Sequence, residues 1–124
     1  MNIKVIVTPS YLEEQSDPAN GRFVFAYTIQ IHNTGDHSVQ LLTRYWQVDH
    51  GNGRIEEIYG EGVVGEQPIL QPGTVYRYQS GAILQSPVGS MSGHYGFVDE
   101  QGNAFQVPIP HFDLIAPRST RTLH

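Results

Sequence analysis

A glycine-rich run, Gly60-Glu-Gly-Val-Val-Gly65, is the segment of this chain whose spacing comes nearest to a ligand-binding motif. It matches the pattern G-x-G-x-x-G, which binds a pyrophosphate when a strand precedes it and a helix follows it. Here Pro68 and Pro72 follow closely, so no long helix can begin after the run. Glu61 and Glu66 also place negative charge where phosphates would lie. A structural bend is therefore the favoured interpretation of the run.

An anion-binding loop is the alternative interpretation, because successive N–H groups of a glycine-rich loop can bind an anion without a helix. This hypothesis predicts a phosphate-containing small molecule, such as a nucleotide or pyrophosphate, as the ligand. The arginines of the proposed site supply the counter-charge. The site would consist of Gly60, Gly62, Gly65, Arg44 and Arg54.

Arg44 alternates with Leu42 and Trp46 on an expected strand, so its guanidinium can cross an aromatic ring or reach a carboxylate. An arginine at the edge of the core, paired with a glutamate, is the simpler expectation.

Residues with the spacing of a catalytic or metal site do not occur in the sequence. The chain has no cysteine, which excludes thiolate nucleophiles, disulfides and Cys-ligated metals. The run Gly89-Ser-Met-Ser-Gly93 places its serines beside the centre of a nucleophile elbow, not at it. The six histidines form no H-E-x-x-H motif, and the adjacent Glu56 and Glu57 point to opposite faces of a strand. We expect no catalytic residue, metal site, cofactor or intrinsic phosphoester hydrolysis.

Composition narrows the class of protein further. With 124 residues and a formal charge of −5, the chain has the size of one domain and lacks the basic excess of a nucleic-acid binder. Its longest apolar stretch, Phe23 to Tyr27, is far shorter than the roughly 20 residues that cross a bilayer. The start of the chain has no signal-peptide pattern. We expect a single domain over residues 1–117, a flexible tail over 118–124, and a cytoplasmic protein without membrane contact.

Two-residue alternation of apolar and polar side chains predicts a fold built from strands. It is longest over residues 22–33, where Phe23, Phe25 and Tyr27 share one face. Glycine and asparagine predict hairpin tips at 33–36, 51–53 and 99–103. The other expected strands are centred on Ile3–Val7, Ser38–His50, Arg54–Tyr59, Thr74–Leu84, His94–Asp99, Asn103–Ile109 and Phe112–Ile115.

Seven or eight short strands in about a hundred residues are typical of an all-β, two-sheet antiparallel sandwich of the immunoglobulin or fibronectin type III kind. Trp46 falls on the third expected strand, where such sandwiches often bury a tryptophan. The segment from Leu70 to Tyr76 has the spacing of a tyrosine corner, and an ordinary Pro-Gly turn is the alternative. The expected core contains Phe23, Phe25 and Tyr27 or their alternate face, with Trp46, Val48, Tyr76, Tyr95 and Phe97.

Several short motifs in a fixed order resemble the ApaG family over nearly the whole chain. They are Arg44-Tyr-Trp46, Gly60 to Pro68, Leu70-Gln-Pro-Gly73, Tyr78-Gln-Ser-Gly81, Gly89 to Tyr95 and Pro110-His-Phe-Asp-Leu114. The resemblance implies a fibronectin type III-like sandwich and an association with cobalt and magnesium sensitivity. It also implies an interaction module, since the family's eukaryotic members carry the domain as an attachment within larger proteins. It supplies no catalytic residue.

Three hypotheses on function follow from the sequence and the resemblance. The first is a non-enzymatic interaction module with an unidentified protein partner. The second is the binding of a nucleotide or pyrophosphate through the loop Gly60–Gly65. The third is a metal-responsive protein that acts through histidines and carboxylates. A transporter is excluded, because no segment of the sequence is long and apolar enough to span a bilayer.

Overall fold

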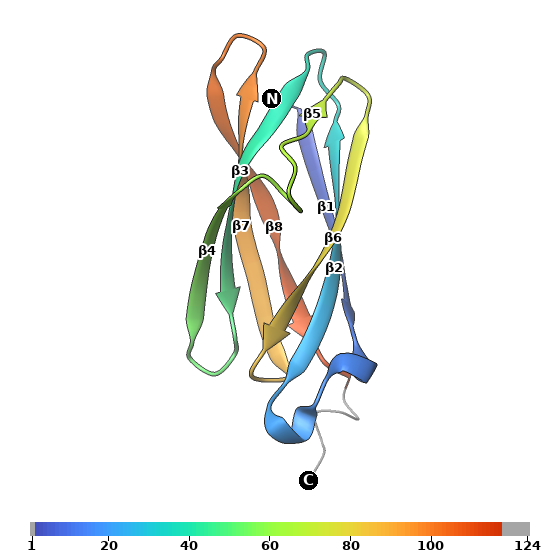
Figure 1. Cartoon of the computed structure of the whole chain (residues 1–124), viewed down its shortest axis with the longest axis vertical. Coiled ribbons are helices and arrows are strands. Elements are labelled where there is room, and N and C mark those ends of the chain that lie inside the picture. Colours follow the sequence, from blue (N-terminus) through green and yellow to red (C-terminus); the bar gives the residue numbers. More distant parts are fainter. Residues whose placement is uncertain (1, 118–124) are drawn as a thin grey trace.

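Alternating apolar residues give the chain two antiparallel sheets that face one another, in a computed structural model that describes residues 2–117 (Figure 1). The smaller sheet has the strand order β1-β2-β6, and the larger has the order β4-β3-β7-β8, with β5 paired to β3. This arrangement confirms the predicted all-β sandwich. The expected tail, 118–124, lies outside the described residues. The strands are β1 (Ile3–Tyr11), β2 (Phe23–Asn33), β3 (Val39–Asp49), β4 (Ile55–Glu61), β5 (Ile69–Leu70), β6 (Val75–Leu84), β7 (Val88–Asp99) and β8 (Ala104–Ile115).

The core lies between the two sheets and contains nearly all of the residues predicted for it. The alternation in β2 turns Phe23, Phe25 and Tyr27 inward, and all three are buried. Tyr76 is the exception, since it is only partly buried and packs against the edge of the core. The buried members of the predicted set are Phe23, Phe25, Tyr27, Trp46, Val48, Tyr95 and Phe97.

Two irregularities in the larger sheet change which side chains face the core. The register of β3 against β7 shifts between Leu41 and Thr43, so Leu42 is an extra residue and the inward-facing parity changes there. Leu41 is consequently fully buried on the same side as Trp46. The prediction that Leu42 and Trp46 share one face of the strand is wrong. The second irregularity lies within β8, opposite Met91 to Gly93.

The irregularity in β8 joins two segments that the sequence presents as separate strands. Val107 and Ile109 are buried before it and Phe112 and Leu114 after it, which is a change from odd to even positions. The expected strands Asn103–Ile109 and Phe112–Ile115 are therefore one strand. Likewise β7 begins at Val88, so the run Gly89–Gly93 lies in a strand.

Turns predicted from glycine and asparagine differ in what they connect. The tip at 51–53 joins β3 to β4, and the tip at 99–103 joins β7 to β8, so both are hairpins. The segment after Asn33 instead connects β2 to β3, which belong to different sheets. Buried Asn33 fixes this crossover, because its Nδ2 donates to the carbonyl oxygens of His37 and Leu70 at 2.8 and 2.9 Å.

The segment Leu70–Tyr76 is an ordinary Pro-Gly turn and no tyrosine corner. Gly73 has a φ of +80° and follows Pro72, as a type II turn requires. The hydroxyl of Tyr76 donates to Oε1 of Glu66 at 2.5 Å instead of to the backbone of the corner. Burial, together with this bond and the charge of Glu66, raises the pKa of Tyr76 to about 12.

One long side of the sandwich is open, and this geometry positions the candidate site. The two sheets meet along β1 and β8, which make many contacts. On the opposite side, β4 and β6 are the free edge strands of their sheets (Figure 1). In the part of the chain that the structure describes, no helix has the length and apolar character that a membrane crossing needs.

Candidate functional site

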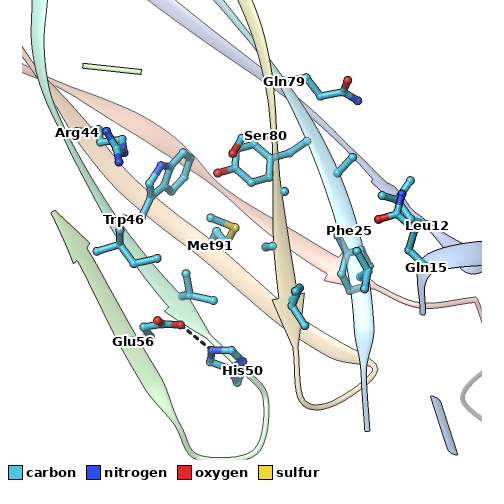
Figure 2. Close-up of a pocket in the computed structure, with 18 of the residues that line it drawn as sticks. Leu12, Gln15, Phe25, Arg44, Trp46, His50, Glu56, Gln79, Ser80 and Met91 are labelled. Atoms are coloured by element: carbon cyan, nitrogen blue, oxygen red, sulfur yellow. Dashed lines mark hydrogen bonds and ion pairs between the residues drawn. The ribbon is translucent and has the colours of Figure 1, made fainter. Parts of the chain in front are cut away.

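A cleft of about 1210 Å³ runs along the open side of the sandwich, between the edges β4 and β6. Figure 2 shows side chains of β3 and β4 on one wall and those of β2, β6 and the segment after β1 on the other. Five consecutive residues of β6, 79–83, line it, so the cleft follows the backbone of this strand as well as its side chains. The lining includes Leu12, Gln15, Arg22, Phe25, Tyr27, Arg44, Trp46, Val48, His50, Arg54, Glu56, Ile58, Val63, Val64, Gly65, Tyr78 and Met91.

The charge of the cleft is opposite to that of the chain. Arg22, Arg44 and Arg54 line it, and among the carboxylates of residues 2–117 only Glu56 does so. The whole chain has a formal charge of −5. Folding therefore gathers arginines on the open side, and an anionic ligand is favoured there.

Aromatic side chains form the floor of the cleft. The ring of Tyr27 lies 5.4 Å from that of Trp46 and 5.8 Å from that of Phe112, measured between centroids. Trp46 and Phe112 meet edge to face at 5.9 Å. Trp46 is only 3% exposed, so the floor is continuous with the hydrophobic core.

Three tyrosine hydroxyls lie within the electrostatic reach of Arg44. Burial raises the pKa of Tyr27, Tyr78 and Tyr95, and the positive charge of Arg44 acts in the opposite direction on each. The hydroxyls of Tyr78 and Tyr95 share a hydrogen bond, and the hydroxyl of Ser80 stabilises the ionised form of Tyr27. These groups stay neutral near pH 7 and can form hydrogen bonds.

Arg44 is held on the cleft wall by backbone carbonyls, so the predicted pairing with a glutamate is wrong. Its Nη1 donates to the carbonyl oxygens of Glu61 and Gly62 at 3.0 and 2.9 Å. Within residues 2–117, the ion pairs within 4.0 Å are those of His50 and His111, and neither involves an arginine. The positive charge of Arg44 is therefore not neutralised by a carboxylate.

Gly60 makes room for Arg44. A Cβ atom at position 60 would lie 2.6 Å from Cζ of Arg44, so the guanidinium covers this glycine directly. Gly60 pairs with Arg44 across β3 and β4 and does not have a positive φ. The first glycine of the run therefore leaves the space in which the guanidinium of Arg44 packs against the backbone of β4.

The other two glycines of the run build a tight hairpin. Val63 and Glu66 exchange two backbone hydrogen bonds of 2.8 and 2.9 Å, and Val64 and Gly65 between them have φ values of 44° and 81°. Gly62 has a φ of +64°, and a Cβ there would lie 2.1 Å from the carbonyl oxygen of Glu66.

The N–H groups of this loop are largely engaged by the protein itself. Gly62 donates to Leu42 O at 2.8 Å, while Val63 and Glu66 donate to each other. The extra residue in β3, Leu42, thus supplies the carbonyl that anchors the loop. This geometry favours the structural interpretation of the glycine run, and pyrophosphate binding by the run stays a prediction.

Of the residues predicted for the ligand site, the structure brings some together and separates others. Gly60, Gly62 and Arg44 are in contact, and Gly65 lies at the cleft. Arg54 lines the same cleft but precedes β4, whereas Gly60 lies near the other end of that strand.

Sequence reasoning missed much of the cleft, including the pair formed by His50 and Glu56. Nε2 of buried His50 lies 3.1 Å from Oε1 of Glu56, and Nδ1 of His50 is buried without a partner in the described part of the chain (Figure 2). One signal was available: Arg44 and Trp46 occupy even positions of β3, and His50, the residue directly after the strand, continues this alternation. No three His, Asp or Glu side chains in residues 2–117 gather as metal ligands would.

Comparisons with known proteins agree with this architecture. Residues 13–99 match the family model of the ApaG domain. The chain is 58% identical over 107 residues to Protein ApaG of Pectobacterium atrosepticum, and 54% identical over 107 residues to Protein ApaG of Escherichia coli O1:K1, covering 86% of each chain in both cases. It is also similar to a crystal structure of a Bordetella pertussis protein named as an ApaA protein. The TM-score is 0.92, with 48% sequence identity over 94% of this chain and 95% of that one. This chain therefore belongs to the ApaG family.

Proposed function

We propose that this protein is a non-catalytic interaction module that binds an extended, acidic segment of a partner protein in the cleft between β4 and β6. The charge of the cleft carries this proposal: three arginines and one glutamate line it in a chain whose formal charge is −5. An acidic segment complements that charge, and complementary charge raises both the specificity and the rate of association.

The size and walls of the cleft favour a peptide over a small molecule. Its volume of about 1210 Å³ exceeds the range of about 300–1,000 Å³ that is usual for small-molecule pockets. One wall is the free edge of β6, whose consecutive residues 79–83 all line the cleft. An extended segment can add to such an edge as a further strand, with affinity from main-chain hydrogen bonds and specificity from alternate side chains.

Arg44 is the anchor for a carboxylate of that segment. Its Nη1 is fixed by two carbonyl oxygens, which orients the rest of the planar guanidinium before any ligand arrives. A guanidinium binds a carboxylate through paired N–H donors, and a pre-oriented one loses less entropy on binding. Ser80 lies on the facing sheet (Figure 2), and its hydroxyl and that of Tyr27, which also lines the cleft, can donate to the same ligand.

A phosphate-containing small molecule is the second candidate ligand, because Arg44 and the neighbouring hydroxyls suit a phosphate as well as a carboxylate. In neither case do we propose catalysis, and we expect no turnover of a dinucleoside polyphosphate. A cytoplasmic location is also part of the proposal. It is supported by the lack of cysteine, since small secreted domains are commonly rich in disulfides. Any association with cobalt and magnesium sensitivity would then act through the partner.

Fluorescence anisotropy with two labelled decapeptides tests the proposal. One alternates valine and glutamate, and the other alternates valine and lysine. We expect the acidic peptide to bind and the basic one not to bind. Arg44→Ala should weaken binding about tenfold or more, since a hydrogen bond to a charged group contributes about 1.5–3 kcal/mol. Gly60→Ala should weaken it too, by displacing the guanidinium from its place over that glycine.

Arg77→Ala is the matched control. Arg77 is an exposed arginine of β6 that does not line the cleft. Its replacement removes the same charge outside the cleft and should change the affinity for the peptide less than twofold. Equal binding of both peptides, or equal effects of the two arginine variants, would contradict the proposal. If inorganic pyrophosphate binds in an Arg44-dependent way and the acidic peptide does not bind, the ligand is a phosphate-containing small molecule and not a peptide.

A further inference from the structure

The outer face of the larger sheet carries a row of ring-bearing side chains that the cleft does not involve. Four residues oppose one another in direct register across β4, β3, β7 and β8: Tyr59, Tyr45, His94 and Pro108. We call them the ring row. Because directly opposed residues of antiparallel strands point to the same face, all four lie on the side of the sheet away from the core.

Three rings of the row contact one another: Tyr45 stacks on His94 and is tilted against Tyr59. Ring centroids are 4.8 Å apart for Tyr45 and Tyr59, and 4.9 Å apart for Tyr45 and His94. Tyr59 is 72% exposed at the edge of the sheet, and Pro108 is exposed at the other end. Cross-strand packing alone does not require so exposed a tyrosine at the edge.

The charged side chains that the strand register of residues 2–117 places on this face are carboxylates, and one of them, Asp113, has the imidazole of His111 3.2 Å away. The register places Asp49, Glu57, Glu61 and Asp113 on the same side as Tyr45, with no lysine or arginine among the strand residues of that side. The hydroxyl of Tyr45 donates to Oε1 of Glu57 at 2.9 Å, which fixes a carboxylate beside the stacked rings. The outer face therefore has the opposite charge to the cleft.

We propose that the ring row binds an arginine side chain of a partner protein. A guanidinium is attracted to the face of an aromatic ring and stacks flat on it, which a lysine ammonium cannot do. Glu57, beside the rings, supplies the carboxylate that pairs with the guanidinium. This site is independent of the cleft, and it takes a partner of the opposite charge.

Nuclear magnetic resonance on the isotope-labelled full chain tests this proposal, with the capped pentapeptide Gly-Gly-Arg-Gly-Gly as the probe. We expect shifts of the resonances of Tyr59, Tyr45 and His94, smaller shifts with lysine in the probe, and none with citrulline, the neutral analogue of arginine. Tyr59→Leu should weaken binding roughly two- to fivefold, the range of an exposed cation–π contact. Tyr59→Phe should retain it, and Glu57→Gln should weaken it.

Gln47→Ala is the control, because Gln47 lies exposed on the same face outside the ring row. Unchanged affinity in Tyr59→Leu, or equal shifts with the citrulline probe, would overturn the proposal and leave the row as cross-strand packing. Self-association in sedimentation velocity that Tyr59→Leu abolishes would also overturn it, in favour of a second copy of the chain as the occupant.

Discussion

Replacing Trp46 with alanine should lower the free energy of unfolding by about 3–5 kcal/mol, the usual cost of removing a buried tryptophan side chain. Trp46 is 3% exposed, and its ring contacts those of Tyr27 and Phe112 between the two sheets. Truncation removes these contacts and leaves a cavity, because strands on both sides are held in place by their ladders. Urea denaturation followed by circular dichroism measures the effect.

Trp46→Phe is the matched control, since it keeps an aromatic ring in the same place and should lose clearly less stability than the alanine variant. A loss below about 1 kcal/mol for Trp46→Ala would mean that the indole does not fill the core. The floor of the cleft would then not be a continuation of the core.

Gly62→Ala should produce the second large loss of stability. The left-handed backbone at Gly62, with a φ of +64°, costs a residue other than glycine about 1–3 kcal/mol. The new Cβ would in addition lie 2.1 Å from the carbonyl oxygen of Glu66, so the hairpin that follows must move. The expected result is a loss larger than the backbone strain alone, measured in the same urea experiment.

Gly65→Ala separates these two contributions. Gly65 has a φ of +81°, but a Cβ there would meet nothing within 4 Å, so this variant should show the backbone strain alone. Equal losses in the two alanine variants would show that the close approach between Gly62 and Glu66 does not matter. A negligible loss in both would refute the structural role of the glycine run.

The strands could be predicted because their signal is local. In β2 the alternation of Phe23, Phe25 and Tyr27 continues without interruption, and the resulting face is the one that the core buries. The hairpin tip at 51–53 could be predicted for the same reason, since its glycines at 51 and 53 take the positive φ values that such a tip needs. Both features depend on neighbours in the sequence.

Features that depend on pairing between distant strands could not be predicted. The extra residue Leu42 shows only in the register of β3 against β7, and it decides whether Leu41 or Leu42 faces the core. The crossover after Asn33 looks like a hairpin tip until the two sheets are assigned. The cleft arises because β4 and β6 end their respective sheets on the same side, a property of the topology and not of any segment.

The glycine run shows why a motif needs its structural context. Its spacing matches a phosphate-binding pattern, yet each glycine has a different local reason in this fold. Gly60 accommodates the guanidinium of Arg44, Gly62 lies against the backbone of Glu66, and Gly65 occupies a left-handed position of a tight turn. Sequence reasoning placed the run and Arg44 in one candidate site, but only the structure shows how they contact each other.

We propose above that the cleft between β4 and β6 receives an extended acidic segment along the free edge of β6. Amide hydrogen exchange of the full chain, followed by nuclear magnetic resonance with and without the valine–glutamate decapeptide, tests it most directly. We expect slower exchange of amides within residues 79–83 and shifts of the Arg44 side-chain resonances, and we expect Arg44→Ala to need about tenfold more peptide for the same protection of residues 79–83. Unchanged exchange along β6 at saturating peptide, or protection confined to β1 or the outer face of the larger sheet, would contradict it.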